Sequence, residues 1–235
     1  MVRSISIAAI VALAGSAHAE TITFNELEHG RIVNTQYTSM GVTIAANNLA
    51  RSFDLAVAFD TQRTSTADPD LEDPWDRGNI PANTRLGKIL IIQENNTGTG
   101  DGIANNPDDE GSRPAGELIF TFSRPMTKFG TDIVDIESAV AETGGLQFYR
   151  NNTLLAYVTW SMFLNPASSY YDSTIVLGDN SANRIAPIFA SRFGVDGFDK
   201  VVVKMGGSGG VDNIVLPTPA SALLLVGLAA FPRRR

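Results

Sequence analysis

Short apolar segments bounded by turn-forming residues make up most of the interior of this chain, and they constrain its fold more than any other feature. Several segments alternate with a period of two, as in residues 117–122, where Leu118 and Phe120 alternate with Ile119 and Thr121. Alternation without long helical periodicity is typical of half-buried strands. The pattern predicts an all-β fold, an antiparallel β-sandwich of jelly-roll or lectin-like type. The predicted strands are residues 21–24, 41–45, 53–59, 88–94, 117–122, 128–137, 146–150, 153–160, 173–177, 184–190, 200–205 and 211–216.

The composition fits a single domain of this kind. The 235 residues are 43% hydrophobic, which is enough for a packed core and too much for a disordered chain. One large all-β domain can use this length, and we expect it to span residues 20–215. Because the chain has no cysteine, disulfides, thiolate metal sites, iron–sulfur clusters and a cysteine nucleophile are excluded.

The N-terminal segment, residues 1–19, has the three parts of a secretory signal peptide. A basic start with Arg3 precedes an apolar run over residues 5–15, and the segment ends in Ala-His-Ala. The apolar run is too short for a transmembrane helix, which needs about 20 residues. We therefore expect an N-terminal signal helix that signal peptidase removes after Ala19.

The C-terminal segment, residues 216–235, has the features of a second sorting signal. Proline residues precede an apolar stretch over residues 220–231, and three arginines end the chain. This order predicts a short hydrophobic transmembrane helix with a cytoplasmic C-terminus, because positive residues stay on the cytoplasmic side. The alternative is an ordinary helix packed on the domain. The residues of the predicted sorting motif are Pro217, Pro219, Ala220, Arg233, Arg234 and Arg235.

This tail resembles the PEP-CTERM class of bacterial sorting signals, in particular the variant with the motif Val-Pro-Leu-Pro-Ala. The matching residues are Leu216, Pro217, Thr218, Pro219 and Ala220, so Leu stands for Val and Thr for the central Leu. The resemblance implies a Gram-negative source, an exosortase-like membrane protease as partner, and a link to exopolysaccharide or biofilm. It also implies transient anchoring in the inner membrane before the protein reaches the cell surface or the extracellular space.

The interior resembles a group of uncharacterised exported bacterial proteins that carry the same type of tail. The residues that carry this resemblance are 59–61, 68–71, 87–94, 108–109 and 132–137. It implies a shared β-sandwich and no activity to inherit. The last of these stretches contains Asp135 and Glu137, carboxylates near a strand end that either face a ligand or point to solvent.

The charge of the interior excludes one class of partner. Of the 18 Lys and Arg residues, Arg3 and the last three arginines lie in the terminal segments, which leaves 14 against 25 acidic residues and a net charge of −11. A surface of this charge repels nucleic acid and anionic lipid headgroups. It suits a soluble domain outside the cell or the capture of cations.

Two long loops, residues 61–86 and 95–115, interrupt the strands and are rich in carboxylates. Loops of this length inside a domain are usually functional or disordered. Clustered carboxylates suit Ca²⁺, which takes about six to eight oxygen ligands, and the spacing of the acids does not fit an EF-hand. The alternative is a pair of solvated acidic loops. The predicted metal ligands in the two loops are Asp68, Asp70, Glu72, Asp108 and Asp109.

A second candidate calcium site joins the two ends of the domain. Glu26 or Glu28 follows the first predicted strand, and Asp212 and Asn213 lie in the last one. Sheet closure is expected to bring Glu26 and Asp212 together. The opening residues 22–27 and 41–44 are similar to those of carbohydrate-binding sandwiches, and this resemblance implies a structural calcium at such a junction.

Aromatic side chains suggest carbohydrate as a ligand. Trp75 lies in the first acidic loop, where an indole ring needs something to cover it, and sugars stack on such rings. Trp160 ends an alternating strand and is expected in the core. Residues 206–210 lack the lysine of a phosphate loop and are interpreted as a hairpin linker.

These observations favour an exported, non-catalytic β-sandwich protein of the cell surface or extracellular matrix, with calcium-supported polysaccharide binding. The alternative is a secreted glycan-active hydrolase that uses two loop carboxylates. His29 is the one histidine outside the predicted signal, and no Gly-x-Ser-x-Gly motif occurs, so serine-nucleophile chemistry is not indicated.

Overall fold

The computed structural model describes residues 20–217 of the chain. The predicted signal helix and C-terminal helix, and with them Pro219, Ala220 and Arg233 to Arg235, lie outside the described residues. Pro217 is described and directly follows the last strand. Within the described part of the chain, no helix is long and apolar enough to span a membrane.

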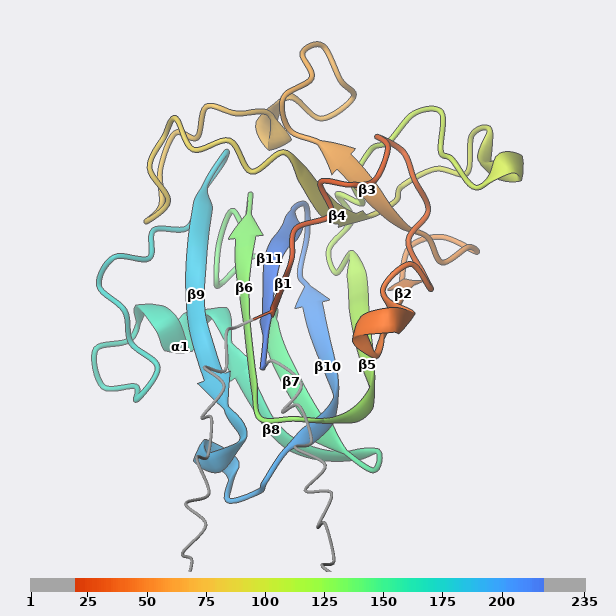
Figure 1. The fold of residues 1–235 in the computed structure, drawn as a ribbon. Helices are drawn as coiled ribbons and strands as arrows, with labels where there is room; N and C mark the ends of the chain where they lie inside the picture. Colours follow the sequence, from red (N-terminus) through yellow and green to blue (C-terminus); the bar gives the residue numbers. More distant parts are fainter. Residues whose placement is uncertain (1–19, 218–235) are drawn as a thin grey trace, which may run out of the picture.

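Two antiparallel sheets form a β-sandwich, as the alternating segments predict (Figure 1). The first sheet has the order β3-β4-β11-β6-β9, and β1 pairs with β11. Its strands are β1 (Glu20–Ile22), β3 (Ala56–Asp60), β4 (Lys88–Ile92), β6 (Lys128–Val134), β9 (Ala182–Phe189) and β11 (Gly210–Leu216). The second sheet has the order β2-β5-β10-β7-β8. Its strands are β2 (Val42–Asn48), β5 (Gly116–Met126), β7 (Gly145–Arg150), β8 (Thr153–Thr159) and β10 (Phe198–Met205).

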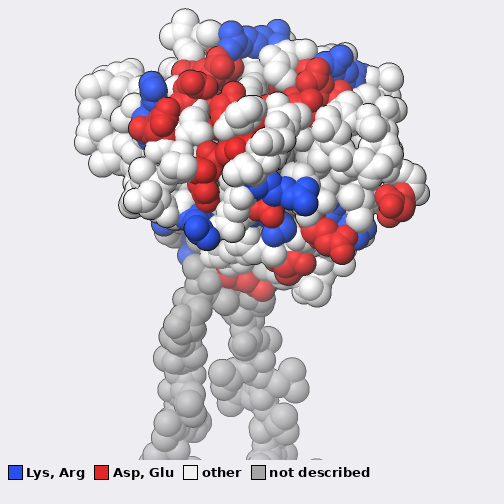
Figure 2. Space-filling view, turned by 90° about the horizontal axis from the view of Figure 1, so that it is seen from above, with Lys and Arg blue, Asp and Glu red and all other residues white. Residues whose placement is uncertain are grey.

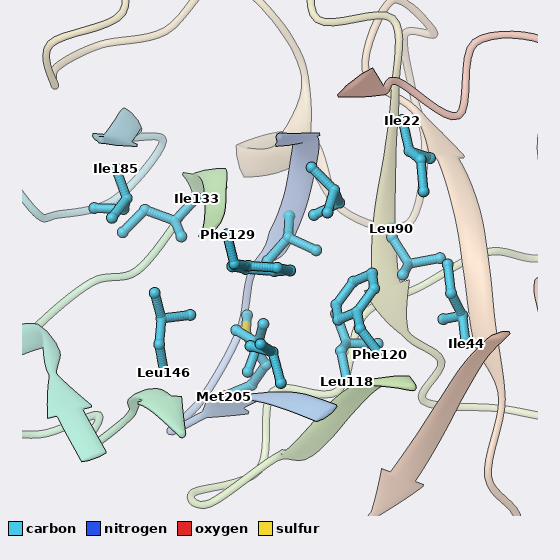
Figure 3. Packing of buried hydrophobic residues seen from close by; sticks show 14 of the residues in the cluster. Ile22, Ile44, Leu90, Leu118, Phe120, Phe129, Ile133, Leu146, Ile185 and Met205 are labelled. Atoms are coloured by element: carbon cyan, nitrogen blue, oxygen red, sulfur yellow. The ribbon is translucent and has the colours of Figure 1, made fainter. Parts of the chain in front are cut away.

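The main hydrophobic cluster is built from the facing sides of the two sheets (Figure 3). Strand β5 shows how the sequence forms it: Leu118, Phe120 and Phe122 are buried, while Thr121 and Ser123 are exposed. Successive side chains of a strand point to opposite faces, so period-two alternation places one set inside. Burial of each side chain of this size contributes about 1.5 to 3 kcal/mol to the free energy of unfolding.

A second hydrophobic cluster lies on the other face of the first sheet. In β4, Leu90 belongs to the main cluster, and its neighbours Ile89 and Ile91 belong to the second. The loop of residues 61–86, called the loop layer below, covers this face and is drawn in orange to yellow above β3 and β4 in Figure 1. The loop-layer residues in the second cluster are Leu71, Trp75, Ile80 and Leu86. Strands β3, β4 and β6 of the first sheet are therefore buried on both faces.

Helical structure is sparse in the described residues, as the sequence predicts. The one α-helix there is α1 (Trp160–Leu164), a single turn that the sequence analysis did not predict. The 3-10 turns are Thr38–Met40, Pro69–Leu71, Thr99–Asp101 and Ala190–Phe193. Trp160 is buried, as expected for a core residue. Asn151 and Asn152 have φ angles of 49° and 63° in the tight turn between β7 and β8, which asparagine tolerates well.

The predicted strand at residues 173–177 is wrong. The side chain of Asn183 supplies the hydrogen bonds that a neighbouring strand would make, since its Oδ1 accepts from the Val176 N–H (3.0 Å) and its Nδ2 donates to the Val176 carbonyl (2.8 Å). A single amide group therefore holds this segment as a loop along β9.

The predicted hairpin at residues 206–210 is also wrong. Strand β10 pairs with β5 and β7, and β11 pairs with β4 and β6 in the other sheet, so the glycine-rich segment crosses between sheets. Glycine is needed for close approach, because a Cβ atom at Gly206 would lie 2.3 Å from the backbone of Glu142. The crossing also places Ser208 beside the acidic loops, as described next.

Candidate metal centre

Three aspartates from separate segments meet at one edge of the loop layer. Their carboxylate oxygens lie within 4.8 Å of one another, and this set is called the aspartate triad below. Asp70 belongs to the 3-10 turn Pro69–Leu71, Asp135 directly follows β6, and Asp179 lies in the turn before β9. Asp135 has a φ angle of 55°, which bends the chain at the strand end. Chain folding thus brings together residues that are far apart in the sequence.

Two of the triad carboxyls are in surroundings that disfavour their charge. Burial raises the pKa of Asp135 to about 8, and the neighbouring carboxylate of Asp70 adds to this shift. Burial likewise raises the pKa of Asp70, with a further contribution from Asp179. The Oδ1 atom of Asp70 is buried and has no hydrogen-bond partner in the described residues. An uncompensated acceptor of this kind is costly unless something positive binds it.

Three more aspartates extend the triad into a larger acidic cluster. Asp68 accepts a hydrogen bond at Oδ2 from the backbone N–H of Asp109 (2.6 Å). The hydroxyl of Ser208 contacts Oδ2 of Asp109 (2.8 Å) and Oδ2 of Asp135 (2.9 Å) and so links both groups. Burial raises the pKa of Asp68 to about 7 and raises the pKa values of Asp109 and Asp108 as well.

No lysine or arginine among the described residues forms a salt bridge with these six aspartates. Arg51 pairs with Glu94 and Glu110, and Arg113 pairs with Glu137 and Glu142. Two charged carboxylates 4.8 Å apart repel by about 3.5 kcal/mol at an effective dielectric constant of about 20. The cluster must therefore take up protons or a cation. Because all side-chain donors of the triad are carboxylate oxygens, they suit a hard cation such as Ca²⁺.

Of the five predicted loop ligands, four lie in or beside the aspartate triad and one makes hydrogen bonds within its own loop. Asp70 belongs to the triad, and Asp68, Asp108 and Asp109 lie in the acidic cluster beside it. The carboxylate of Glu72 instead accepts hydrogen bonds from the backbone N–H and the hydroxyl of Thr66 (3.0 and 2.8 Å). Glu72 therefore closes its own loop through Oε1 and is not one of the three triad carboxylates, so its role as a metal ligand stays a prediction.

Asp135 and Asp179 are the triad members that the sequence analysis did not assign as ligands. Asp135 was open to two interpretations as a carboxylate at a strand end, and the structure shows it buried. Asp179 carries no local signal, because its role depends on the position of the turn before β9 relative to the loop layer. The signals in the sequence that point to this site are therefore the acidic loop around Asp70 and the strand-end carboxylate Asp135.

The second predicted site is formed only in part. Strand β1 pairs with β11 as expected, and Asp212 is fully buried opposite Asp132. Burial raises the pKa of Asp212 to about 8, with contributions from Asp132 and from Glu26. Arg184 binds both carboxylate oxygens of Asp132 at 2.9 Å. Glu26 is exposed, and it acts on Asp212 through its charge.

The prediction that Trp75 presents its ring to a sugar is not met by its position. The side chain is 2% exposed in the second hydrophobic cluster, and its Nε1 donates to the carbonyl of Thr84 (2.9 Å). The loop layer folds back over the first sheet and supplies the cover that an indole ring needs. His29 is half-buried, with its Nδ1 accepting from the Asp60 N–H (3.0 Å), which indicates a structural role.

The face seen from above the loop layer carries many acidic side chains (Figure 2). Asp and Glu run in a band across this face, and Lys and Arg lie beside the band. This distribution fits the net charge of −11 between the terminal segments, where 14 basic residues stand against 25 acidic ones. A field of this sign concentrates cations near the surface.

Comparisons with known proteins give little further information. No protein-family model and no curated protein matches the chain. Among solved structures, the chain is similar to the K2 cleaved adhesin domain of Lys-gingipain, with 12% sequence identity and a TM-score of 0.41. The match covers 86% of this chain and 99% of that one. This likeness is too weak to assign a family or an activity.

Proposed function

We propose that this chain is an exported, non-catalytic protein whose β-sandwich domain binds Ca²⁺ at the aspartate triad. The observation that carries the proposal is the meeting of Asp70, Asp135 and Asp179 within 4.8 Å. No salt bridge to a basic residue balances them in the described part of the chain. A divalent cation would remove their mutual repulsion and would satisfy the unpartnered Oδ1 of Asp70.

Calcium fits this site better than the other common metals. Zinc sites use cysteine or histidine as a rule, and neither residue type belongs to the triad. Magnesium requires near-ideal octahedral geometry, whereas calcium accepts irregular sets of oxygen ligands from loops. Asp68, Asp108 and Asp109 would supply further negative charge around the ion. Glu26 and Asp212 form a second candidate site of lower charge.

Export and its partners rest on the sequence alone. The signal segment supports processing by signal peptidase, and the tail that resembles PEP-CTERM signals supports processing by an exosortase-like protease. We place the mature protein at the cell surface or outside the cell, linked to extracellular polysaccharide through this resemblance. Extracellular calcium modules bind the ion with dissociation constants of about 10⁻⁴ to 10⁻³ M, which is the range we expect here.

Calorimetric titration of the full chain with CaCl₂ tests the calcium proposal. We expect one Ca²⁺ ion per chain to bind at the aspartate triad with a dissociation constant near 10⁻⁴ M, more tightly than any ion at the second candidate site. Asp135→Asn should weaken this binding at least tenfold, while Asp196→Asn, a matched change at an exposed aspartate outside the cluster, should leave it unchanged. Absence of binding at millimolar calcium would refute the proposal, as would equal binding by both variants.

A further inference from the structure

The aspartate triad and the second hydrophobic cluster are built from the same short stretches of backbone. Leu71 directly follows Asp70, and Val134 directly precedes Asp135. Ala182, three residues after Asp179, is also in the second cluster. Each triad carboxylate is therefore at most three residues along the backbone from a side chain buried in the second cluster.

Hydrogen bonds beside the triad hold the loop layer in place. The Nδ2 of Asn180 donates to the carbonyl oxygens of Asp70 (3.1 Å) and Glu72 (2.9 Å). The backbone N–H of Asp76 donates to Oδ1 of Asn180 (2.8 Å). The backbone N–H of Asn180 in turn donates to Oδ1 of Asp135 (2.7 Å). A change in the distance between the triad carboxylates acts directly on these bonds.

The two hydrophobic clusters differ in what closes them. The main cluster lies between two sheets whose strands are joined by backbone hydrogen-bond ladders. The second cluster has a sheet on one side and the loop layer on the other, and the loop layer contains no strand and only the 3-10 turn Pro69–Leu71. Segments with few ladder hydrogen bonds open at lower free energy than core strands.

We infer that Ca²⁺ at the aspartate triad closes the loop layer over the second hydrophobic cluster, and that loss of the ion opens the loop layer while the sandwich stays folded. This inference rests on the proposed calcium binding. It adds a regulatory role: the ion controls access to the second cluster, which includes Trp75 and Leu71. If the protein is exported, the loop layer closes once the chain meets millimolar calcium.

Limited trypsin digestion of the full chain, followed by mass spectrometry, tests this inference. The loop layer contains three exposed cleavage sites, at Arg63, Arg77 and Arg85. Arg192, exposed in the 3-10 turn after β9, is a matched site outside the loop layer. The rate at each loop-layer site is divided by the rate at Arg192 in the same digest, so that effects of calcium on the protease cancel.

We expect the three ratios to be at least tenfold higher in EGTA than in 5 mM CaCl₂, and 5 mM MgCl₂ should not replace calcium. Asp135→Asn should lose this calcium dependence, and Asp196→Asn should keep it. If calorimetry shows calcium binding but the ratios do not change, the inference fails and the proposed function stands. Equal acceleration at Arg192 would show global unfolding and would also overturn the inference. If calcium does not bind at all, the proposed function itself fails.

Discussion

Replacing Asp135 by asparagine should have opposite effects on stability with and without calcium. Asp135 and Asp70 are triad partners with oxygens within 4.8 Å, so their charged forms repel by about 3.5 kcal/mol at an effective dielectric constant of about 20. Burial and this repulsion raise the pKa of Asp135 to about 8 from 3.8, so at pH 9 the folded chain carries a strongly disfavoured charge. Asparagine has the same shape and no charge.

The change in the hydrogen bonds of residue 135 lowers the stability of the Asp135→Asn variant and so opposes the gain from removing the charge. Asparagine can still accept from the N–H of Asn180 through its oxygen, but its amide group would face the hydroxyl of Ser208. Reorienting that hydroxyl costs about 1 kcal/mol at most. The charge effect is larger, so in EGTA at pH 9 we expect Asp135→Asn to raise the free energy of unfolding by about 3 kcal/mol, or the Tm by roughly 6 to 12 °C.

Differential scanning calorimetry in EGTA and in 10 mM CaCl₂ measures the stability change of the variant without and with calcium. At a dissociation constant of about 10⁻⁴ M, 10 mM calcium stabilises the wild-type chain by about 2.7 kcal/mol, and Asp135→Asn should lose most of this gain. Asp196→Asn is the control and should shift neither Tm. If Asp135→Asn were less stable than wild type in EGTA, hydrogen bonding would outweigh charge repulsion at this position, contrary to the prediction.

Three further predictions concern the same fold. The pKa values of Asp68 and Asp135, about 7 and 8, exceed the values in the unfolded chain, so the folded chain binds more protons between pH 5 and 9. Urea unfolding in EGTA should therefore show the free energy of unfolding falling as the pH rises from 5 to 9, and calcium should reduce this fall. Trp75→Ala should lower the free energy of unfolding by about 3 to 5 kcal/mol, because the indole is buried in the second cluster; a loss below 1 kcal/mol would contradict this packing. Asn183→Ala should cost about 2 to 3 kcal/mol by leaving the N–H and carbonyl of Val176 unpaired, and hydrogen exchange at Val176 should accelerate.

The strands could be predicted because alternation is a local property of the sequence. In β5, every second side chain from Leu118 to Phe122 is buried, and the residues themselves show this pattern. The failure at residues 173–177 has the opposite cause. Those residues have strand-like composition, but the side chain of Asn183, seven residues after Val176 at the start of β9, takes the place of a pairing strand, and the composition of the segment itself does not show this.

The metal centre could be predicted only as far as its carboxylates lie in the two acidic loops, residues 61–86 and 95–115. The density of carboxylates around Asp70 and Asp108 indicated cation binding. The assignment of Asp135 and Asp179 requires knowing that the end of β6 and the turn before β9 meet the loop layer. The burial of Trp75 could not be predicted for the same reason, since a polar loop sequence does not show that the loop folds back on a sheet.

Anomalous diffraction from crystals grown with Ca²⁺ and soaked with Tb³⁺ would locate the bound ion. We expect the strongest peak among Asp70, Asp135 and Asp179, with carboxylate oxygens at about 2.3 to 2.6 Å from the ion. A strongest peak at Asp212, or no peak at the triad at millimolar metal, would contradict this expectation.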